Sequence, residues 1–161
     1  MKNPIETAKK NTIENAEIFL RNFSHVPDDK LNWSPTPTSK SALRIAAHAS
    51  LYLHRFAEMI ATQSVPAVNN LDEWLAEVHA EETAIKNRDQ VDAAFQSGIE
   101  AVNNALDSLT PADLENSIDS GQGWSMSMTF LINLPAWHTT LHLGQIDYLQ
   151  TCWNDQTIYT S

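Results

Sequence analysis

The chain has 161 residues, of which 42% are hydrophobic, and its 20 acidic and 10 basic side chains give a formal net charge of −10. This length predicts one domain over residues 1–161. The longest apolar run, around residues 131–137, is far shorter than the roughly 18 residues of a membrane span, so no membrane partner is expected. The negative charge repels phosphate backbones, so no nucleic-acid partner is expected. Because the chain has only 1 cysteine, any metal site must use histidine or carboxylate ligands.

The N-terminal segment predicts an amphipathic helix over residues 3–23. Ile13, Ala16, Leu20 and Phe23 recur three or four residues apart, with charged residues between them. This alternation leaves no continuous apolar stretch of the kind found in secretion signals. We therefore expect a cytoplasmic protein.

A connector and a second helix follow. Residues 27–39 hold three prolines, which favour extended and turn conformations. Ser39 or Ser41 then caps a helix that runs to Gln63. Its inward stripe is mostly apolar and has one histidine at its centre: Ile45, His48, Leu51, Tyr52, Phe56 and Met59.

The second half of the chain predicts two more long helices. Residues 64–89 form a long connection with a short amphipathic piece around residues 71–78, a length typical of a crossover. Helices are then expected over residues 90–109 and 127–153, with Pro135 either kinking the last helix or marking its start. Four main helices joined by one long connection predict an all-α, four-helix bundle.

Two histidines in the last predicted helix are candidates for chemistry. His138 and His142 lie four residues apart, so both imidazoles share one helical face. Their neighbours on the helical wheel include Trp137, Leu141 and Tyr148, so we expect the pair to point into the bundle. Unsatisfied interior nitrogens would cost on the order of 1–3 kcal/mol each, a cost that either a metal ion or hydrogen-bonding partners would remove. The spacing alone leaves both interpretations open.

Two motifs occur in a characteristic order. The first combines residues 31–35, Leu-Asn-Trp-Ser-Pro, with residues 41–48, Ser-Ala-Leu-Arg-Ile-Ala-Ala-His. The second is residues 138–146, His-Thr-Thr-Leu-His-Leu-Gly-Gln-Ile. Together they resemble the proline-rich connector, the start of the second helix and the terminal two-histidine signature of the DinB/YfiT-like superfamily. These proteins are bacterial helical bundles related to the mycothiol-dependent maleylpyruvate isomerase domain.

The resemblance implies an up-down-down-up bundle, with the long connection between helices two and three, often paired as a homodimer. It also implies a site for one divalent metal ion, of the nickel, zinc or iron type, carried here by His48, His138 and His142. Three protein ligands leave the open position that catalytic metal sites keep. A dimer is also favoured because the chain has more large aromatic side chains than one small core can bury. These are Trp74, Trp124 and Trp153.

The remaining histidines are expected on the surface. His54 lies about 120° round the second helix from His48, and His25 and His79 fall in connections. Arg55 follows His48 by two helical turns, where it could hold a substrate carboxylate. We favour a buried stem with its charged end in solvent at the end of the bundle.

An open-sided three-histidine metal site is compatible with several functions. Because the resembling family includes metal-dependent transferases and an isomerase that use low-molecular-weight thiols, the leading hypothesis is transfer between such a thiol and a small electrophilic substrate. Metal-dependent hydrolysis is one alternative, for which the inward stripes offer no convincing proton acceptor. The other is a noncatalytic metal-binding or stress-response domain, because fold and ligands alone do not establish turnover.

Overall fold

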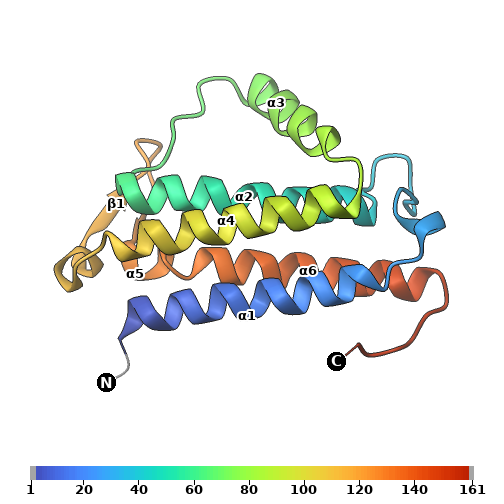
Figure 1. Cartoon of the computed structure of the whole chain (residues 1–161). Helices are drawn as coiled ribbons and strands as arrows, with labels where there is room; N and C mark the ends of the chain where they lie inside the picture. Colours follow the sequence, from blue (N-terminus) through green and yellow to red (C-terminus); the bar gives the residue numbers. More distant parts are fainter. Residues whose placement is uncertain (1–2, 160–161) are drawn as a thin grey trace.

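Four long helices run side by side in the computed structural model, which describes residues 3–159 (Figure 1). They are α1 (Pro4–Ser24), α2 (Ala42–Thr62), α4 (Arg88–Asp107) and α6 (Leu134–Cys152). Helices α1 and α6 run in one direction and α2 and α4 in the other (Figure 1). The up-down-down-up four-helix bundle predicted from the sequence is therefore confirmed.

Side-chain caps set where the helices begin. Ser41, rather than Ser39, caps α2 by accepting a hydrogen bond from a backbone N–H of its first turn. Asn87 caps α4 in the same way, so this helix begins two residues earlier than expected. Pro135 occupies the first turn of α6, where its missing N–H removes no helical hydrogen bond. The proline therefore marks the start of the last helix and does not kink it.

The connection between α2 and α4 is more ordered than expected. It contains α3 (Leu71–Ala84), a helix of 14 residues that crosses above the bundle (Figure 1). Because α2 and α4 are parallel neighbours, the chain must travel back along the bundle between them. Only Val78 and Glu82 of α3 are buried, so this crossover helix packs on the bundle along a narrow line.

Short elements close the two ends of the bundle. The single turn η1 (Asp28–Lys30) lies in the connector between α1 and α2. Four more elements lie between α4 and α6: η2 (Pro111–Glu115), β1 (Ser117–Asp119), β2 (Ser125–Ser127) and α5 (Met128–Leu131). The two strands pair antiparallel. Three residues in each are too few for an alternating pattern to predict them.

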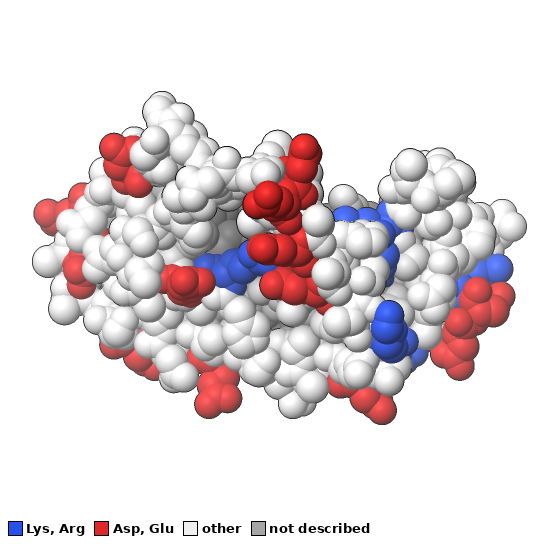
Figure 2. Space-filling model, turned by 90° about the horizontal axis from the view of Figure 1, so that it is seen from above, with Lys and Arg blue, Asp and Glu red and all other residues white. Residues whose placement is uncertain are grey.

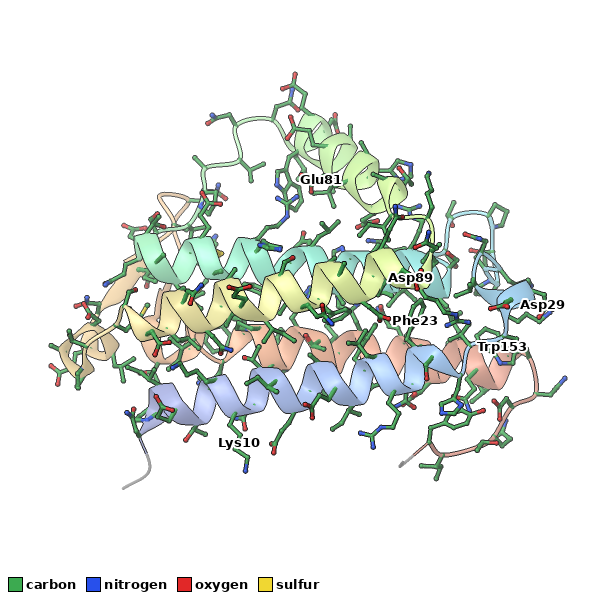
Figure 3. The ribbon with its side chains drawn as sticks, viewed as in Figure 1. Lys10, Phe23, Asp29, Glu81, Asp89 and Trp153 are labelled. Atoms are coloured by element: carbon green, nitrogen blue, oxygen red, sulfur yellow. The ribbon has the colours of Figure 1, made fainter. Side chains whose placement is uncertain are left out.

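The core is filled by large side chains from all four long helices. Phe19 of α1 and Phe95 of α4 are fully buried, with ring centroids 5.1 Å apart. Phe23 points into the bundle and Lys10 points away from it, as the amphipathic pattern of α1 predicts (Figure 3). No helix within residues 3–159 has the length and apolar character needed to cross a membrane.

Helices α2 and α4 lie in close contact at Gly98. A Cβ atom there would lie 2.7 Å from the Cβ of Leu53 and 3.2 Å from the carbonyl oxygen of Ser50. We expect Gly98→Ala to lower the free energy of unfolding by about 1–2 kcal/mol in urea denaturation, since overpacking outweighs the helix propensity that alanine adds. The exposed Gln96→Ala change should alter it by less than about 0.5 kcal/mol. Equal stability of the two variants would contradict this account of the α2–α4 contact.

Candidate metal centre

Three histidines from two helices meet in one cluster. His48 comes from the second turn of α2, and His138 and His142 come from successive turns of α6. One ring nitrogen of each lies within 4.8 Å of the others. The ring centroids are 4.3 Å apart for His138 and His142, 4.7 Å for His48 and His142, and 5.2 Å for His48 and His138. The structure therefore brings together the three residues that the family resemblance implied.

Hydrogen bonds orient two of the three rings. The Nδ1 atom of His142 lies 2.7 Å from the side-chain oxygen of Gln145, and Nδ1 of His48 lies 2.7 Å from Oε1 of Glu82. Both partners are acceptors, so these contacts favour a proton on Nδ1 and a free lone pair on Nε2 in each ring. The Nζ atom of Lys40 also lies 3.1 Å from Nδ1 of His48. Partners of this kind are typical around histidines that ligate metals.

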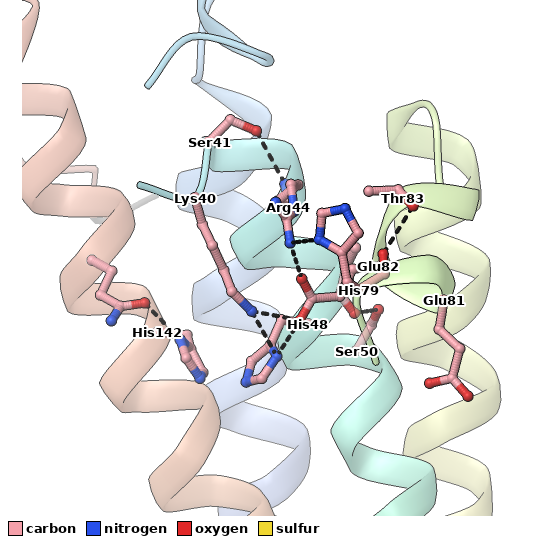
Figure 4. A network of polar contacts seen from close by, with 12 residues as sticks. Lys40, Ser41, Arg44, His48, Ser50, His79, Glu81, Glu82, Thr83 and His142 are labelled. Carbon is pink, nitrogen blue, oxygen red and sulfur yellow. Dashed lines mark hydrogen bonds and ion pairs between the residues drawn. The ribbon is translucent and has the colours of Figure 1, made fainter. Parts of the chain in front are cut away.

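Glu82 was not predicted as part of the site, because it lies in α3, a helix expected only as a short piece of a connection. It is 1% exposed and bridges α3 to the start of α2 (Figure 4). Its Oε2 atom accepts a hydrogen bond of 2.9 Å from Arg44, and its Oε1 atom binds Lys40 as well as His48. The sequence around residue 82 gives no sign that this glutamate is buried while the acidic residues near it are exposed.

The charge of Glu82 is maintained by these contacts. Burial by itself raises the pKa of the carboxyl group, but hydrogen bonds from His48, Lys40 and Arg44 outweigh it and lower the pKa to about 2. The carboxylate is therefore ionised at neutral pH. With two cationic partners, the network as a whole carries a net positive charge beside the histidine cluster.

His138 is the least satisfied member of the cluster. Its Nδ1 atom is buried without a hydrogen-bond partner, while its Nε2 atom lies 3.0 Å from Nε2 of His142. Burial is the main cause that lowers the pKa of the imidazole to about 3, followed by the charges of His142 and His48. Two facing nitrogen lone pairs at this distance repel unless a proton or a cation lies between them. A neutral, crowded and partly buried imidazole fits a metal ligand.

Aromatic rings line one side of the cluster. Tyr52 stacks on His138 with centroids 4.8 Å and planes 17° apart, and Phe56 approaches the same imidazole edge-on at 5.2 Å. Burial is the main cause that raises the pKa of the Tyr52 phenol, so it stays protonated at neutral pH. These two rings cover one side of the His138 imidazole.

The two histidines of α6 face His48 of α2, as expected, but the apolar neighbours that supported this expectation do not share their direction. Trp137, Leu141 and Tyr148 do not point into the bundle: they are 59%, 50% and 67% exposed. The inward positions of the helix are instead filled by Ile146 and Leu149, among others. Apolar and polar residues occur on every side of this helix, so its pattern does not show which side is buried. The two histidines of α6 therefore lie at the boundary between the core and an exposed apolar face.

The other predicted positions can also be compared with the structure. His25, His54 and His79 are all exposed, as expected, although Nδ1 of His79 lies 2.7 Å from Nη2 of Arg44. Trp153 was expected to be left outside the core, but it packs against it and meets Trp33 edge-on at 5.9 Å.

Arg55 does not extend freely into solvent. Its guanidinium lies over the rings of Tyr52 and Trp74, at 5.4 and 5.9 Å from their centroids, and forms an ion pair with Glu81 of α3. The charged end is therefore held beneath the crossover helix and not at the end of the bundle.

Two cavities flank the cluster. One of about 320 Å³ lies beneath α3 and is lined by Tyr52, Arg55, Phe56 and Trp74, among others. Figure 2 shows a hollow on this side of the molecule, with basic and acidic groups beside it. The other, of about 470 Å³, is lined in part by Lys40, Gly144, Gln145 and Tyr148. Lys40 and Gln145 contact His48 and His142, so this second cavity adjoins the cluster directly.

The fold and the site define a four-helix bundle protein with a three-histidine cluster between its second and last long helices. A family model for the DinB superfamily matches residues 12–146, and the chain belongs to this superfamily. The resemblance seen in the sequence motifs is thereby confirmed. No curated protein matches the chain.

Solved structures share the fold at low sequence identity. YfiT from Bacillus subtilis, described as a probable metal-dependent hydrolase, has a TM-score of 0.73 at 14% identity and covers 97% of this chain and 91% of its own. The DinB-like protein YjoA from Bacillus subtilis has a TM-score of 0.66 at 17% identity, with 95% and 96% covered. A mycothiol-dependent maleylpyruvate isomerase has a TM-score of 0.68 at 12% identity, with 89% of this chain covered. The present chain spans 61% of the length of that isomerase.

Proposed function

We propose that this DinB-superfamily protein binds one divalent metal ion through His48, His138 and His142. The observation that carries the proposal is the convergence of three imidazoles, two of which have an acceptor oxygen 2.7 Å from Nδ1. Within residues 3–159, no carboxylate or thiol joins the cluster as a fourth member, which supports an open-sided site. Nickel, zinc and iron-type ions all accept such a ligand set.

The proposed activity is transfer between a low-molecular-weight thiol and a small electrophile. A divalent ion in this site would supply a Lewis acid that favours the thiolate form of a bound thiol. Lys40 and Arg44 add positive charge beside the cluster, of which Glu82 neutralises only part, and this also favours an anionic sulfur. The sulfur lone pair forms the new bond to carbon, the leaving group departs with its electron pair, and the thiol proton passes to solvent.

Hydrolysis is the second candidate activity. It requires a group that accepts a proton from water. Glu82 is the nearest buried carboxylate, but its hydrogen bonds hold its pKa at about 2, so it is a poor base. The Tyr52 phenol is protonated at neutral pH and cannot accept a proton either. These two observations favour thiol transfer over hydrolysis.

A third reading is a noncatalytic metal-binding or stress-response domain. In that case the ion would serve mainly to join α2 to α6. Under all three readings we propose a single-domain chain that acts as a homodimer in the cytoplasm. For the two enzymatic readings the substrate is a small molecule, since the charge of −10 disfavours nucleic acid.

The test compares two reactions on metal-loaded protein. We expect conjugation of glutathione or cysteine to 1-chloro-2,4-dinitrobenzene that requires the metal and falls to background in His142→Ala. Hydrolysis of 4-nitrophenyl acetate without thiol should stay near background, and His54→Ala should behave as the parent protein. Ester hydrolysis without thiol conjugation would contradict transfer and favour a hydrolase. Inactivity in both assays would favour the noncatalytic domain.

A further inference from the structure

The cavity of about 320 Å³ beneath α3 has a mainly apolar wall. It lies between α2, which contributes Tyr52, Phe56 and Met59, and Trp74 of α3, with Val65 from the connection between the two helices. At the liquid volume of water, roughly 30 Å³ per molecule, the cavity corresponds to about ten waters. It therefore has room for a single ring with a short substituent, at the lower end of the size of small-molecule sites.

The cavity borders the candidate metal centre. Tyr52 stacks on His138 with centroids 4.8 Å apart, and Phe56 approaches the same imidazole at 5.2 Å. A molecule in the cavity would therefore contact the two rings that cover His138. The cavity shares no described lining residue with the one of about 470 Å³ that adjoins the cluster through Lys40 and Gln145. Two different molecules can thus occupy the two cavities at the same time, as a transfer between two substrates requires.

One hydrogen-bond donor of the cavity is unused. A tyrosine phenol is protonated at neutral pH and donates one hydrogen bond. Within residues 3–159, the hydroxyl of Tyr52 has no hydrogen-bond partner, although the side chain is only partly exposed. An oxygen atom on a bound molecule can accept this hydrogen bond. The apolar wall and this single donor favour a molecule that is apolar apart from one acceptor.

The charges around the cavity disfavour an anion. Arg55 is the one cation among the described lining residues, and its guanidinium is already paired with Glu81. The carboxylate of Glu58 also lines the cavity and adds negative charge. Two carboxylates against one guanidinium leave this region negative, on a chain of net charge −10. Arg55 is therefore poorly placed to hold a substrate carboxylate.

We propose that this cavity binds the electrophilic substrate, and that this substrate is a small, uncharged compound with one apolar ring and an oxygen that accepts a hydrogen bond from Tyr52. Trp74 and Phe56 offer aromatic surfaces against which such a ring packs. The assignment to the electrophile rests on the proposed transfer reaction. The class of the ligand rests only on the lining of the cavity.

The first test measures binding to the full chain by NMR, after chelation of metal. The sequence has 4 methionines, so labelling their methyl groups with carbon-13 gives few signals, and that of Met59 reports on the cavity. Acetophenone should shift this signal with a Kd of roughly 0.1–1 mM, as expected for about nine non-hydrogen atoms. Benzoate has the same size but is anionic, and it should bind at least about tenfold more weakly. Met126 and Met128 do not line the cavity and serve as references.

Two variants separate the hydrogen bond from the apolar contact. Tyr52→Phe removes only the hydroxyl, so acetophenone should bind about 3–10-fold more weakly, whereas ethylbenzene, which has no oxygen, should bind as it does to the parent protein. Trp74→Ala removes apolar surface and should weaken both ligands about tenfold or more. Leu75→Ala is the matched control on the same helix, because Leu75 is exposed and does not line the cavity. Circular dichroism must show native helicity in each variant.

A further variant tests the role of charge. Glu81→Gln removes the carboxylate that pairs with Arg55. The guanidinium is then available to an anion, so benzoate should bind several-fold more tightly than it does to the parent protein. Binding of acetophenone should stay within about twofold, because the wall and the Tyr52 hydroxyl are unchanged.

The second test assigns the cavity to one of the two substrates. In the conjugation of glutathione to 1-chloro-2,4-dinitrobenzene by metal-loaded protein, Trp74→Ala should raise KM for the uncharged aromatic substrate about tenfold. The KM for glutathione should stay within about twofold of the parent value. A rise in KM for glutathione alone would overturn the assignment to the electrophile.

Three binding results would overturn the proposed ligand class. They are a Met59 signal that acetophenone leaves unshifted near its solubility limit, benzoate that binds as tightly as acetophenone, and a Tyr52→Phe protein that binds acetophenone like the parent protein. Conjugation without binding at Met59 would contradict the cavity proposal and leave the proposed function standing. Binding without conjugation would contradict the proposed transfer reaction and, with it, the assignment to an electrophile.

Discussion

Replacing any one of His48, His138 and His142 with alanine should reduce the metal content of the purified protein at least about tenfold. The three ring nitrogens share one small volume, and removal of one leaves a two-ligand chelate with weaker affinity. The loss should be similar for the ligand from α2 and for those from α6, because the ion would contact both helices. Elemental analysis of protein prepared without an affinity tag measures this directly.

His54→Ala is the matched control for these variants. His54 lies on the same helix as His48, but it is exposed and contacts only Ser97 among the hydrogen-bond partners found in the described residues. This variant should keep the metal content of the parent protein. Circular dichroism must show native helicity in every variant. Full metal retention in His48→Ala would leave only the α6 pair as a chelate, and the proposed open three-ligand site would be wrong.

Glu82→Ala should weaken metal binding by about 10–100-fold, although Glu82 is not itself among the proposed ligands. Its carboxylate holds the proton on Nδ1 of His48 and thereby leaves Nε2 free. Without it, the imidazole loses its acceptor, and Lys40 and Arg44 lose their anionic partner beside a divalent cation. Competition with a chromophoric chelator at constant pH measures the affinity. Nitrogen NMR of the metal-free protein reports the tautomer of His48.

Two further variants separate orientation from charge. Glu82→Gln keeps an oxygen that can accept from His48 but loses the negative charge, so its affinity should lie between those of the parent protein and Glu82→Ala. Glu81→Gln changes the neighbouring residue, whose carboxylate is half-exposed and pairs with Arg55. Its affinity should stay within about twofold of the parent protein, as expected for an exposed ion pair. Equal affinity in Glu82→Ala and the parent protein would contradict the positioning role of Glu82.

The sequence by itself determined the features that depend on neighbours along the chain. The 3.6-residue periodicity predicted the long helices, and the i, i+4 spacing placed His138 and His142 on one face. The motif order pointed to the superfamily and, through it, to His48 as the third member of the cluster. Periodicity, residue spacing and motif order can all be seen along the chain without knowing how the helices pack.

Only the tertiary structure decided which residues meet from different elements. Glu82 reaches His48 because the crossover helix lies across α2, a contact between positions 34 residues apart that no periodicity encodes. The direction of Trp137 and Leu141 was equally undetermined, because a helix with apolar residues on every side can turn more than one of them to the core. Packing of α1 and α2 against α6 resolved that choice, burying Ile146 and leaving Trp137 and Leu141 exposed. The side chains around the cluster and the face next to it thus follow from long-range packing, whereas the three histidines follow from helical spacing and from the motif resemblance.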